Sequence, residues 1–220
     1  YEIGVRLVGS EMCIRDSLKP MVIGTFIMVA TYSLFYIMTA FAQAYSRTPS
    51  TLSEAGYPMG LGIPANTFTG LLLISAIVFA IFISISGLYA DKIGRRKWLI
   101  WTTVSILIFA LCMPLFLGNG TPASVFAFLV IGMALMGMTF GPMAALLPEL
   151  FPTEVRYSGA SLAYNIASII GATIAAMISL KINALYGLMG VGIYLAINAF
   201  LTLLALLASK ETKNVDLTQI

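Results

Sequence analysis

Long, uncharged runs of apolar residues are the feature that most limits what this chain can fold into. Each run has about twenty residues, the length that one α-helix needs to cross the hydrocarbon layer of a bilayer. Sixty per cent of the chain is hydrophobic, ten per cent is charged, and the mean hydropathy is +0.97. Soluble domains carry about a quarter charged residues. The sequence therefore predicts an all-α membrane protein in contact with the lipid bilayer.

Turn-forming residues divide the apolar sequence into six predicted spans. Gly, Pro, Ser, Thr and charged residues, which favour turns, make up the connections between them. The spans are Pro20 to Tyr45, Thr67 to Ala90, Trp98 to Leu117, Ala123 to Leu147, Tyr157 to Ile182 and Leu188 to Ser209. We expect a six-helix transmembrane bundle over residues 18–209, with Pro20 starting the first helix and a polar tail over residues 210–220.

The first seventeen residues differ from the rest of the chain. They show neither an amphipathic period nor the layout of a signal peptide. Glu11–Asp16 back-translates as GAG ATG TGT ATA AGA GAC, which closely resembles the mosaic-end adapter of transposase-based sequencing libraries. We therefore interpret residues 1–17 as a sequencing or cloning artefact outside the fold, with a natural polar leader as the alternative.

Positive charge is distributed unequally between the two sides of the predicted bundle. Alternate connections put eight basic residues on one side: Lys19, Lys92, Arg95, Arg96, Lys97, Arg156, Lys210 and Lys213. The other side has Arg47 and Lys181. Basic residues are concentrated in cytoplasmic loops. We expect both ends of the chain to be cytoplasmic.

The residue inventory argues against catalysis. Histidine is absent, and the two cysteines, Cys13 and Cys112, form neither a disulfide framework nor a metal-ligand spacing. The predicted spans are nearly free of ionisable groups, so a nucleophile–base pair or a coupling carboxylate would have to lie elsewhere. We expect no enzyme activity, no cofactor, no metal and no nucleic-acid partner.

Polar side chains share one face on each of two predicted helices. On the first helix these are Thr25, Tyr32, Tyr36, Thr39 and Gln43, and on the fifth Ser161, Tyr164, Asn165 and Ser168. Residues three or four apart lie on the same side of a helix. The stripes could form the wall of an aqueous substrate cavity. They could also form polar contacts between helices, which are common in membrane bundles.

Small residues also recur at intervals of four, which favours close packing of helices. The stripes are Gly137, Gly141 and Ala145 on the fourth span, and Gly159, Ala163, Ala167, Gly171 and Ala175 on the fifth. Pro142 cannot donate a backbone hydrogen bond and should kink the fourth helix.

Two charged turns lie on the predicted cytoplasmic side. In the first, Gly87 would let another helix pack closely, and Gly94 would permit a tight reversal. Asp91 could meet the N-terminus of a neighbouring helix. Glu149 and Arg156, in the second turn, could join the arginines of the first in an arginine–carboxylate network, a latch that forms in one state and breaks in another. The alternative is that these charges only set membrane topology.

The order of these residues resembles known loop signatures. Gly87-x-x-x-Asp91-Lys92-x-Gly94-Arg95-Arg96-Lys97 resembles the cytoplasmic loop motif of the major facilitator superfamily, and Glu149-Leu-Phe-Pro-Thr-Glu-Val-Arg156 resembles its companion loop between helices ten and eleven. The runs at 156–165 and 30–39 resemble the metabolite:proton symporters, which include proline/betaine, shikimate and dicarboxylate carriers. The resemblance aligns residues 18–220 with helices seven to twelve.

This resemblance implies a role for each motif. Asp91 would contact the N-terminal half, while Arg95, Glu149 and Arg156 would form a charge network within this half. The first helix would line the substrate path with parts of the second, fourth and fifth, and the third and sixth would be peripheral. Many relatives carry a proline midway along the eleventh helix, but residues 171–176 lack it.

The resemblance predicts a fragment of a secondary active transporter. The full-length protein would move a small polar metabolite, an organic acid or osmolyte, together with protons by alternating access. It would need an N-terminal six-helix half as its partner. A six-helix structural or channel-type protein, complete in itself, is the alternative.

Overall fold

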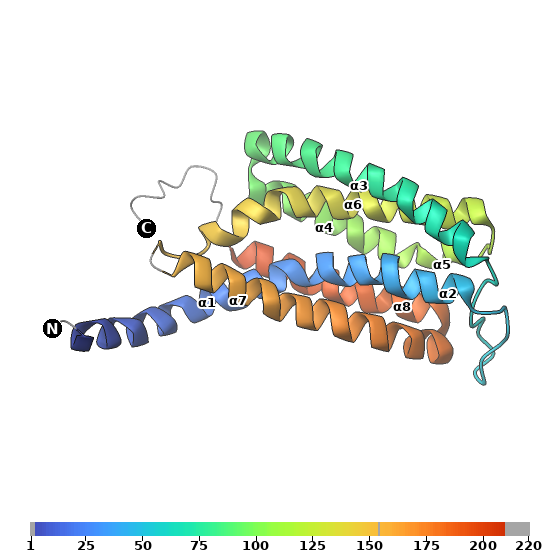
Figure 1. Ribbon diagram of the computed structural model, residues 1–220, viewed down its shortest axis with the longest axis horizontal. Coiled ribbons are helices and arrows are strands. Elements are labelled where there is room, and N and C mark those ends of the chain that lie inside the picture. The colour runs from blue at the N-terminus through green and yellow to red at the C-terminus, as the bar shows by residue number, and fades with distance from the viewer. Residues whose placement is uncertain (1–2, 154, 210–220) are drawn as a thin grey trace.

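The structure, a computed structural model, describes the backbone of residues 3–153 and 155–209, and the side chains of residues 18–153, 155–172, 175 and 177–209. Its helices pack side by side in an elongated bundle (Figure 1). They are α1 (Ile3–Tyr36), η1 (Ile37–Phe41), α2 (Ala42–Arg47), α3 (Ala65–Ile93), α4 (Arg95–Leu111), α5 (Met113–Leu117), α6 (Pro122–Glu149), α7 (Arg156–Ser168), η2 (Ile169–Ile174) and α8 (Ala175–Ala208). The elements η1 and η2 are π-helical turns. The predicted tail, residues 210–220, lies outside the described residues.

Four helical stretches of the described chain are long and apolar enough to cross a membrane. They are Leu18–Arg47, Ala65–Ile93, Pro122–Glu149 and Arg156–Ala208. The predicted third span corresponds to α4 and α5, which are shorter. The predicted fifth and sixth spans form the stretch that begins at Arg156, and its helical backbone is interrupted at Gly187 (φ 67°, ψ −171°). An all-helical membrane bundle is therefore confirmed.

Two predicted boundaries were wrong. Pro20 lies inside α1 rather than at its start, because the helical backbone already begins at Ile3; membrane helices tolerate proline where neighbouring groups satisfy the freed backbone. The predicted connection between the fifth and sixth spans covers the five residues 183–187. Residues 183–186 are helical instead, and Gly187 alone departs from helical backbone there. Residues 3–17 extend α1 beyond the bundle (Figure 1). The interpretation of residues 1–17 as an artefact outside the fold stays a prediction.

The reversal between α3 and α4 takes place at one residue. Gly94 has φ 111°, and α3 ends and α4 begins on either side of it. A side chain at this φ would clash with the backbone, so glycine permits the reversal as predicted. Asp91 therefore sits in the last turn of α3, while Arg95 starts α4. The connection over residues 150–155 lies at the same end of the bundle (Figure 1). We call these two connections and the residues beside them the charged end.

Helices α3 and α6 approach closely through the glycines of α6. A Cβ at Gly137 would lie 2.7 Å from the Phe79 carbonyl oxygen, and one at Gly141 would lie 2.7 Å from the Ile83 carbonyl oxygen. The predicted packing role of this stripe is confirmed. Gly87 was expected to let another helix pack closely; no described atom lies within 4 Å of a Cβ built there, so this stays a prediction. The amide nitrogen of Gly87 would lie 3.2 Å from a Cβ at Gly141, so the backbone of α3 at Gly87 is part of its contact with α6.

The small residues of α7, of η2 and of the start of α8 form the second predicted stripe, which packs against α1 and the end of α6. Ala163, Ala167 and Ala175 are completely buried. A Cβ at Gly171 would lie 2.5 Å from the Cβ of Tyr32. This stripe therefore serves helix packing, as predicted. The π-helical turn η2 includes Gly171 and overlaps residues 171–176, where this chain lacks the proline that the family resemblance led us to look for.

Pro142 leaves the carbonyl group of Met138 without its usual helical donor, because proline has no N–H. The indole Nε1 of Trp98 donates a hydrogen bond to this carbonyl oxygen at 2.9 Å. The ring of Trp98 also stacks on Tyr89, with centroids 5.8 Å apart. The start of α4 is thereby tied to α6 at the proline and to the end of α3.

Candidate substrate cavity and charged end

Two neighbouring cavities lie among α1, α3, α6 and α7. The outer cavity has a volume of about 740 Å³ and reaches the charged end; its walls are Met28, Phe140, Met143, Ala144, Leu147, Pro148, Thr153, Arg156, Tyr157, Ala160, Ser161 and Tyr164. The inner cavity has a volume of about 400 Å³; its walls are Thr31, Tyr32, Phe35, Tyr36, Phe79, Met136, Phe140, Tyr164 and Ser168. Their common wall residues are Phe140 and Tyr164, so these two aromatic side chains mark the boundary between the cavities.

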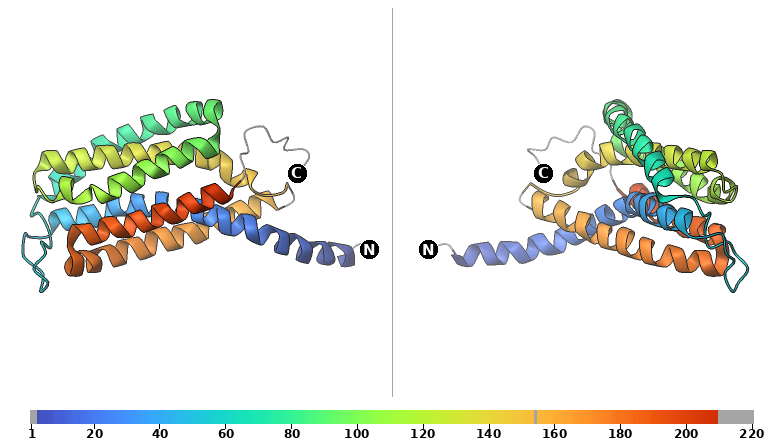
Figure 2. Two further views of the ribbon diagram at one scale, coloured as in Figure 1. Left: turned by 180° about the vertical axis from the view of Figure 1, so that it is seen from behind. Right: turned by 45° about the vertical axis from the view of Figure 1, so that its right-hand side comes forward.

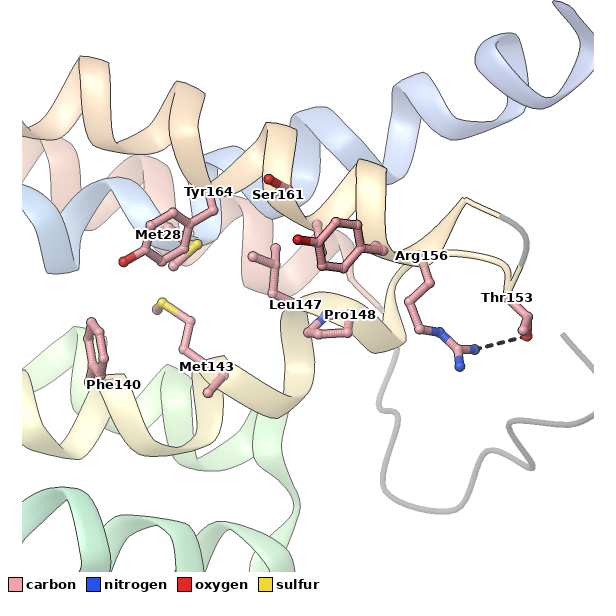
Figure 3. A pocket seen from close by; sticks show the side chains of 12 residues that line it. Met28, Phe140, Met143, Leu147, Pro148, Thr153, Arg156, Ser161 and Tyr164 are labelled. Carbon is pink, nitrogen blue, oxygen red and sulfur yellow. Dashed lines mark hydrogen bonds between the residues drawn. The ribbon is translucent and has the colours of Figure 1, made fainter. Parts of the chain in front are cut away.

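The side chains at this boundary come from opposite walls. In Figure 3, Phe140 and Met143 project from α6 toward Met28 and Tyr164 on the other side of the outer cavity. Arg156 lies at the far end, next to Thr153 (Figure 3). The outer cavity is therefore apolar near the boundary and polar where it reaches the charged end.

The inner cavity has an aromatic wall without charged side chains. Among the described residues, its lining contains no Asp, Glu, Lys or Arg. Its six aromatic rings form three steeply angled pairs: Tyr32 with Tyr164 (84°), Phe35 with Tyr36 (90°) and Phe79 with Phe140 (66°). Aromatic rings favour such edge-to-face contacts. Each ring is therefore braced by a neighbour, which gives the cavity a defined shape.

Four of the predicted cavity residues line the inner cavity, namely Tyr32, Tyr36, Tyr164 and Ser168. Tyr164 lines the outer cavity as well. The Tyr32 hydroxyl is buried and has no hydrogen-bond partner among the described residues. A buried hydroxyl without a hydrogen bond costs about 1–3 kcal/mol of free energy, and a ligand that accepts a hydrogen bond from it would offset this cost.

Of the other predicted polar residues, Ser161 lines the outer cavity, whereas Thr25, Thr39, Gln43 and Asn165 lie apart from both linings as described. Thr25 is buried, with 4 % of its surface exposed. Thr39 donates to the Phe35 carbonyl oxygen at 2.7 Å within its own helix, and exposed Asn165 donates to the Ser161 carbonyl oxygen at 2.8 Å. Gln43 is partly buried near the start of α2. Only part of each predicted polar stripe therefore lines a cavity.

Several cavity residues were not predicted, above all Phe79, Phe140 and Met143. They are apolar residues within apolar helices, and a membrane-exposed face of such a helix has the same composition as its cavity face. The sequence therefore carries no local signal for them.

At the charged end, Arg95 contacts two carboxylates. Its guanidinium lies 3.2 Å from Asp91 Oδ1 and also pairs with Glu149 Oε1. The Asp91 side chain is 66 % exposed, whereas that of Glu149 is 14 % exposed. Arg95 therefore joins the end of α3 to the end of α6, and the pair with Glu149 is the better shielded from water.

Arg156 is placed differently from the expected network. Its Nε donates to the Phe151 carbonyl oxygen at 3.3 Å, and its Nη2 donates to Thr153 Oγ1 at 3.3 Å. It thus braces the connection between α6 and α7 and lines the outer cavity. The structure brings Asp91, Arg95 and Glu149 together, while these two hydrogen bonds of Arg156 stay within the connection between α6 and α7.

Arg96 makes a contact that the sequence did not suggest. Its guanidinium donates to the carbonyl oxygens of Leu206 at 2.7 Å and Leu207 at 3.0 Å. These carbonyls are in the last turn of α8, where a cation is favourable. Lys92 and Lys97 are exposed on the same end of the bundle.

The comparisons with known proteins identify the family. Residues 60–220 match the family described as "Sugar (and other) transporter". The chain belongs to this family, within the major facilitator superfamily. No solved structure gives a significant match.

Several relatives are named as transport proteins. The chain is 87 % identical to a "Putative metabolite transport protein" of Haemophilus influenzae over 203 residues, which cover 92 % of this chain and 46 % of that protein. It is 52 % identical to the "Inner membrane metabolite transport protein YhjE" of Escherichia coli, covering 89 % and 43 %, and 32 % identical to the "Proline/betaine transporter" of Salmonella typhimurium, covering 86 % and 35 %. The chain thus spans less than half the length of these relatives.

Proposed function

We propose that this chain is the C-terminal six-helix half of a secondary active transporter for a small polar metabolite, an organic acid or osmolyte. In this proposal the two bundles of the full-length protein rock about a central site and carry protons with the substrate. The six transmembrane helices of this half would then include α4 and α5 together as one membrane span. The stretch Arg156–Ala208 would form two spans, divided at Gly187. The rest of the protein would supply an opposing six-helix half.

The observation that carries the proposal is the composition of the cavity walls. The outer and inner cavities are lined by α1, α3, α6, α7 and the connection before α7, which include the first, second, fourth and fifth predicted spans. The third and sixth contribute no residue to either described lining. This is the division into cavity-lining and peripheral helices that the family resemblance implies. Because one bundle forms only one wall, the second wall would come from the other half.

The charged end supports a role in switching between conformations. Asp91 is largely exposed although it pairs with Arg95, so its carboxylate remains accessible to a further partner. In the proposal, that partner is the N-terminal half, which contacts Asp91 in one orientation of the transporter and releases it in the other. In the proposal, the protein lies in a bacterial inner membrane, and this end faces the cytoplasm together with both chain ends, because basic residues are concentrated around Gly94.

Uptake by the complete protein tests this function. We expect proteoliposomes with the full-length wild-type protein to accumulate labelled metabolite when an inward proton gradient is imposed, and to stop when a protonophore collapses the gradient. Candidate substrates for the screen are proline, glycine betaine, shikimate and dicarboxylates. Accumulation that is indifferent to the protonophore would remove proton coupling from the proposal.

Asp91→Asn in the complete protein tests the switching role. We expect uptake to fall while the amount of folded protein in the membrane stays the same. Glu54→Gln, which removes an exposed carboxylate outside the charged end, is the matched control. Undiminished uptake by Asp91→Asn would reduce the charged turn to a topology signal.

A further inference from the structure

Two residues of α8 bond to the segment of α1 that forms the cavity wall. Thr202 Oγ1 donates to the Phe26 carbonyl oxygen at 2.6 Å and accepts from the Ala30 amide nitrogen at 3.1 Å. One turn away on α8, Asn198 Nδ2 donates to Ser33 Oγ at 3.0 Å. We call Asn198 and Thr202 the polar clamp. Both are buried, with 8 % and 2 % of their surfaces exposed, and α8 runs beside α1 in Figures 1 and 2.

The Thr202 hydroxyl of α8 contacts two backbone groups of α1 that are one helical turn apart. In an α-helix, the carbonyl of Phe26 is the usual acceptor for the amide of Ala30, four residues later. The hydroxyl bonds to both groups, so it contacts the two ends of one turn of the helical hydrogen-bond ladder. A side chain that inserts into this ladder is a recognised cause of bending in helices. Thr202 is therefore placed where it can influence the geometry of α1.

This turn directly precedes the residues that line the inner cavity. Thr31, Tyr32 and Phe35 follow Ala30, and Ser33, which is held by Asn198, lies between Tyr32 and Phe35. On another side of the same segment, Gly171 of η2 packs so closely that a Cβ there would lie 3.2 Å from both the Val29 carbonyl oxygen and the Ser33 amide nitrogen. The cavity-lining part of α1 is thus held by η2 as well as by α8.

We propose that Asn198 and Thr202 are positioning residues, which fix the orientation of Tyr32 toward the inner cavity by holding the α1 turn from Phe26 to Ala30 in its bridged form. They act through α1, because α8 contributes no residue to the described linings of the two cavities. The role in substrate binding rests on the proposed function, whereas the effect on α1 geometry does not.

Transport kinetics of the complete protein test the first part. Thr202→Val keeps the shape of the side chain and removes the hydroxyl, so the Phe26 carbonyl and the Ala30 amide lose their shared partner on α8. We expect KM for uptake to rise about fivefold, as for a lost hydrogen bond of about 1 kcal/mol, with little change in the maximal rate. Thr202→Ser retains the hydroxyl and should restore the wild-type KM.

Thr102→Val is the matched control for this substitution. Thr102 is 1 % exposed, and its hydroxyl donates at 3.0 Å to the Trp98 carbonyl oxygen of its own helix. Its replacement by valine should leave KM at the wild-type value. The same KM for Thr202→Val and Thr102→Val would overturn the proposal.

A distance measurement tests the clamp without transport. Nitroxide labels at Val22 and Ile193, which are 50 % and 48 % exposed, report the direction of α1 relative to α8 by pulsed electron paramagnetic resonance. We expect a shifted distance distribution in Thr202→Val and an unshifted one in Thr202→Ser and Thr102→Val. An unshifted distribution in Thr202→Val would overturn the clamp. Failure of the wild-type protein to take up any substrate would count against the proposed function instead, and the distances would still decide the clamp.

Discussion

The charged end and the inner cavity differ in how their polar groups are satisfied. At the charged end, Arg95 pairs with Asp91 and Glu149, and Arg96 bonds to two carbonyl groups of α8; among the described residues, the second oxygen of Glu149 has no partner. In the inner cavity, the walls are aromatic, and the buried Tyr32 hydroxyl has no hydrogen-bond partner in the part of the chain that the structure describes. The first region joins helices to one another. The second contains a donor that, in the proposed function, pairs with the substrate.

The largest expected effect is at the charged end. Arg95→Leu in the complete protein leaves Glu149 largely buried without its counter-charge, and losing one partner of a buried ion pair costs about 3 kcal/mol or more. We expect a marked fall in the midpoint of thermal unfolding in detergent. The double variant Arg95→Leu with Glu149→Leu should recover much of the loss. If Arg95→Leu unfolds at the wild-type temperature, the pair does not join α4 to α6.

A smaller effect is expected at the contact between α3 and α6, which connects the charged end to the cavity wall. Gly141→Ala puts a methyl group against the backbone of α3, and overpacking of this kind costs about 1–3 kcal/mol. Gly87→Ala is the matched control, since the space around its Cβ is open among the described residues. Thermal unfolding should separate the two variants. Equal destabilisation by both would place the close contact elsewhere.

In the inner cavity, Tyr32→Phe should affect binding rather than folding. The variant removes a buried hydroxyl that has no partner in the described structure, so we expect unchanged or slightly higher thermal stability. KM for uptake should rise about fivefold, because a ligand hydrogen bond of about 1 kcal/mol is lost. Tyr194→Phe on α8 is the control outside both cavities. A drop in stability without a change in KM would mean that Tyr32 serves helix contacts.

The smallest expected effect on stability is at Asp91. Its side chain is 66 % exposed, and its pair with Arg95 spans one helical turn; exposed pairs contribute about 0–1 kcal/mol. Asp91→Asn should therefore lower the unfolding midpoint little, and less in high salt, because salt screens exposed charges. A large loss of stability would show that Asp91, like Glu149, forms a structural ion pair with Arg95.

Much of the helical layout could be predicted because it depends on local signals. Hydropathy places the long helices, and glycine accounts for the tight reversal at Gly94, where φ is positive. The small-residue stripe on α6 predicted close packing against another helix, and the structure shows that this helix is α3. A glycine in a membrane helix shows that close approach is possible but not which neighbour makes it, so the sequence did not name α3, and the expected approach at Gly87 stays a prediction.

The cavity could be predicted only in part because it depends on how each helix is rotated. Tyr32, Tyr36 and Tyr164 stood out as polar residues in apolar helices, whereas Phe79 and Phe140 did not. Thr202 and Asn198 also escaped prediction, because a single polar residue on a helix that is expected to be peripheral has no visible partner in the sequence. The π-helical turns η1 and η2 likewise have no sequence signal that we recognised.

The most direct test of the account compares residues 18–220 with the complete protein. Both are reconstituted separately in proteoliposomes, and substrate uptake is measured under the same inward proton gradient. We predict accumulation by the complete protein and none by residues 18–220, because one bundle provides only one wall of the substrate path. Accumulation by residues 18–220 alone would contradict the proposal and favour a protein that is complete in six helices.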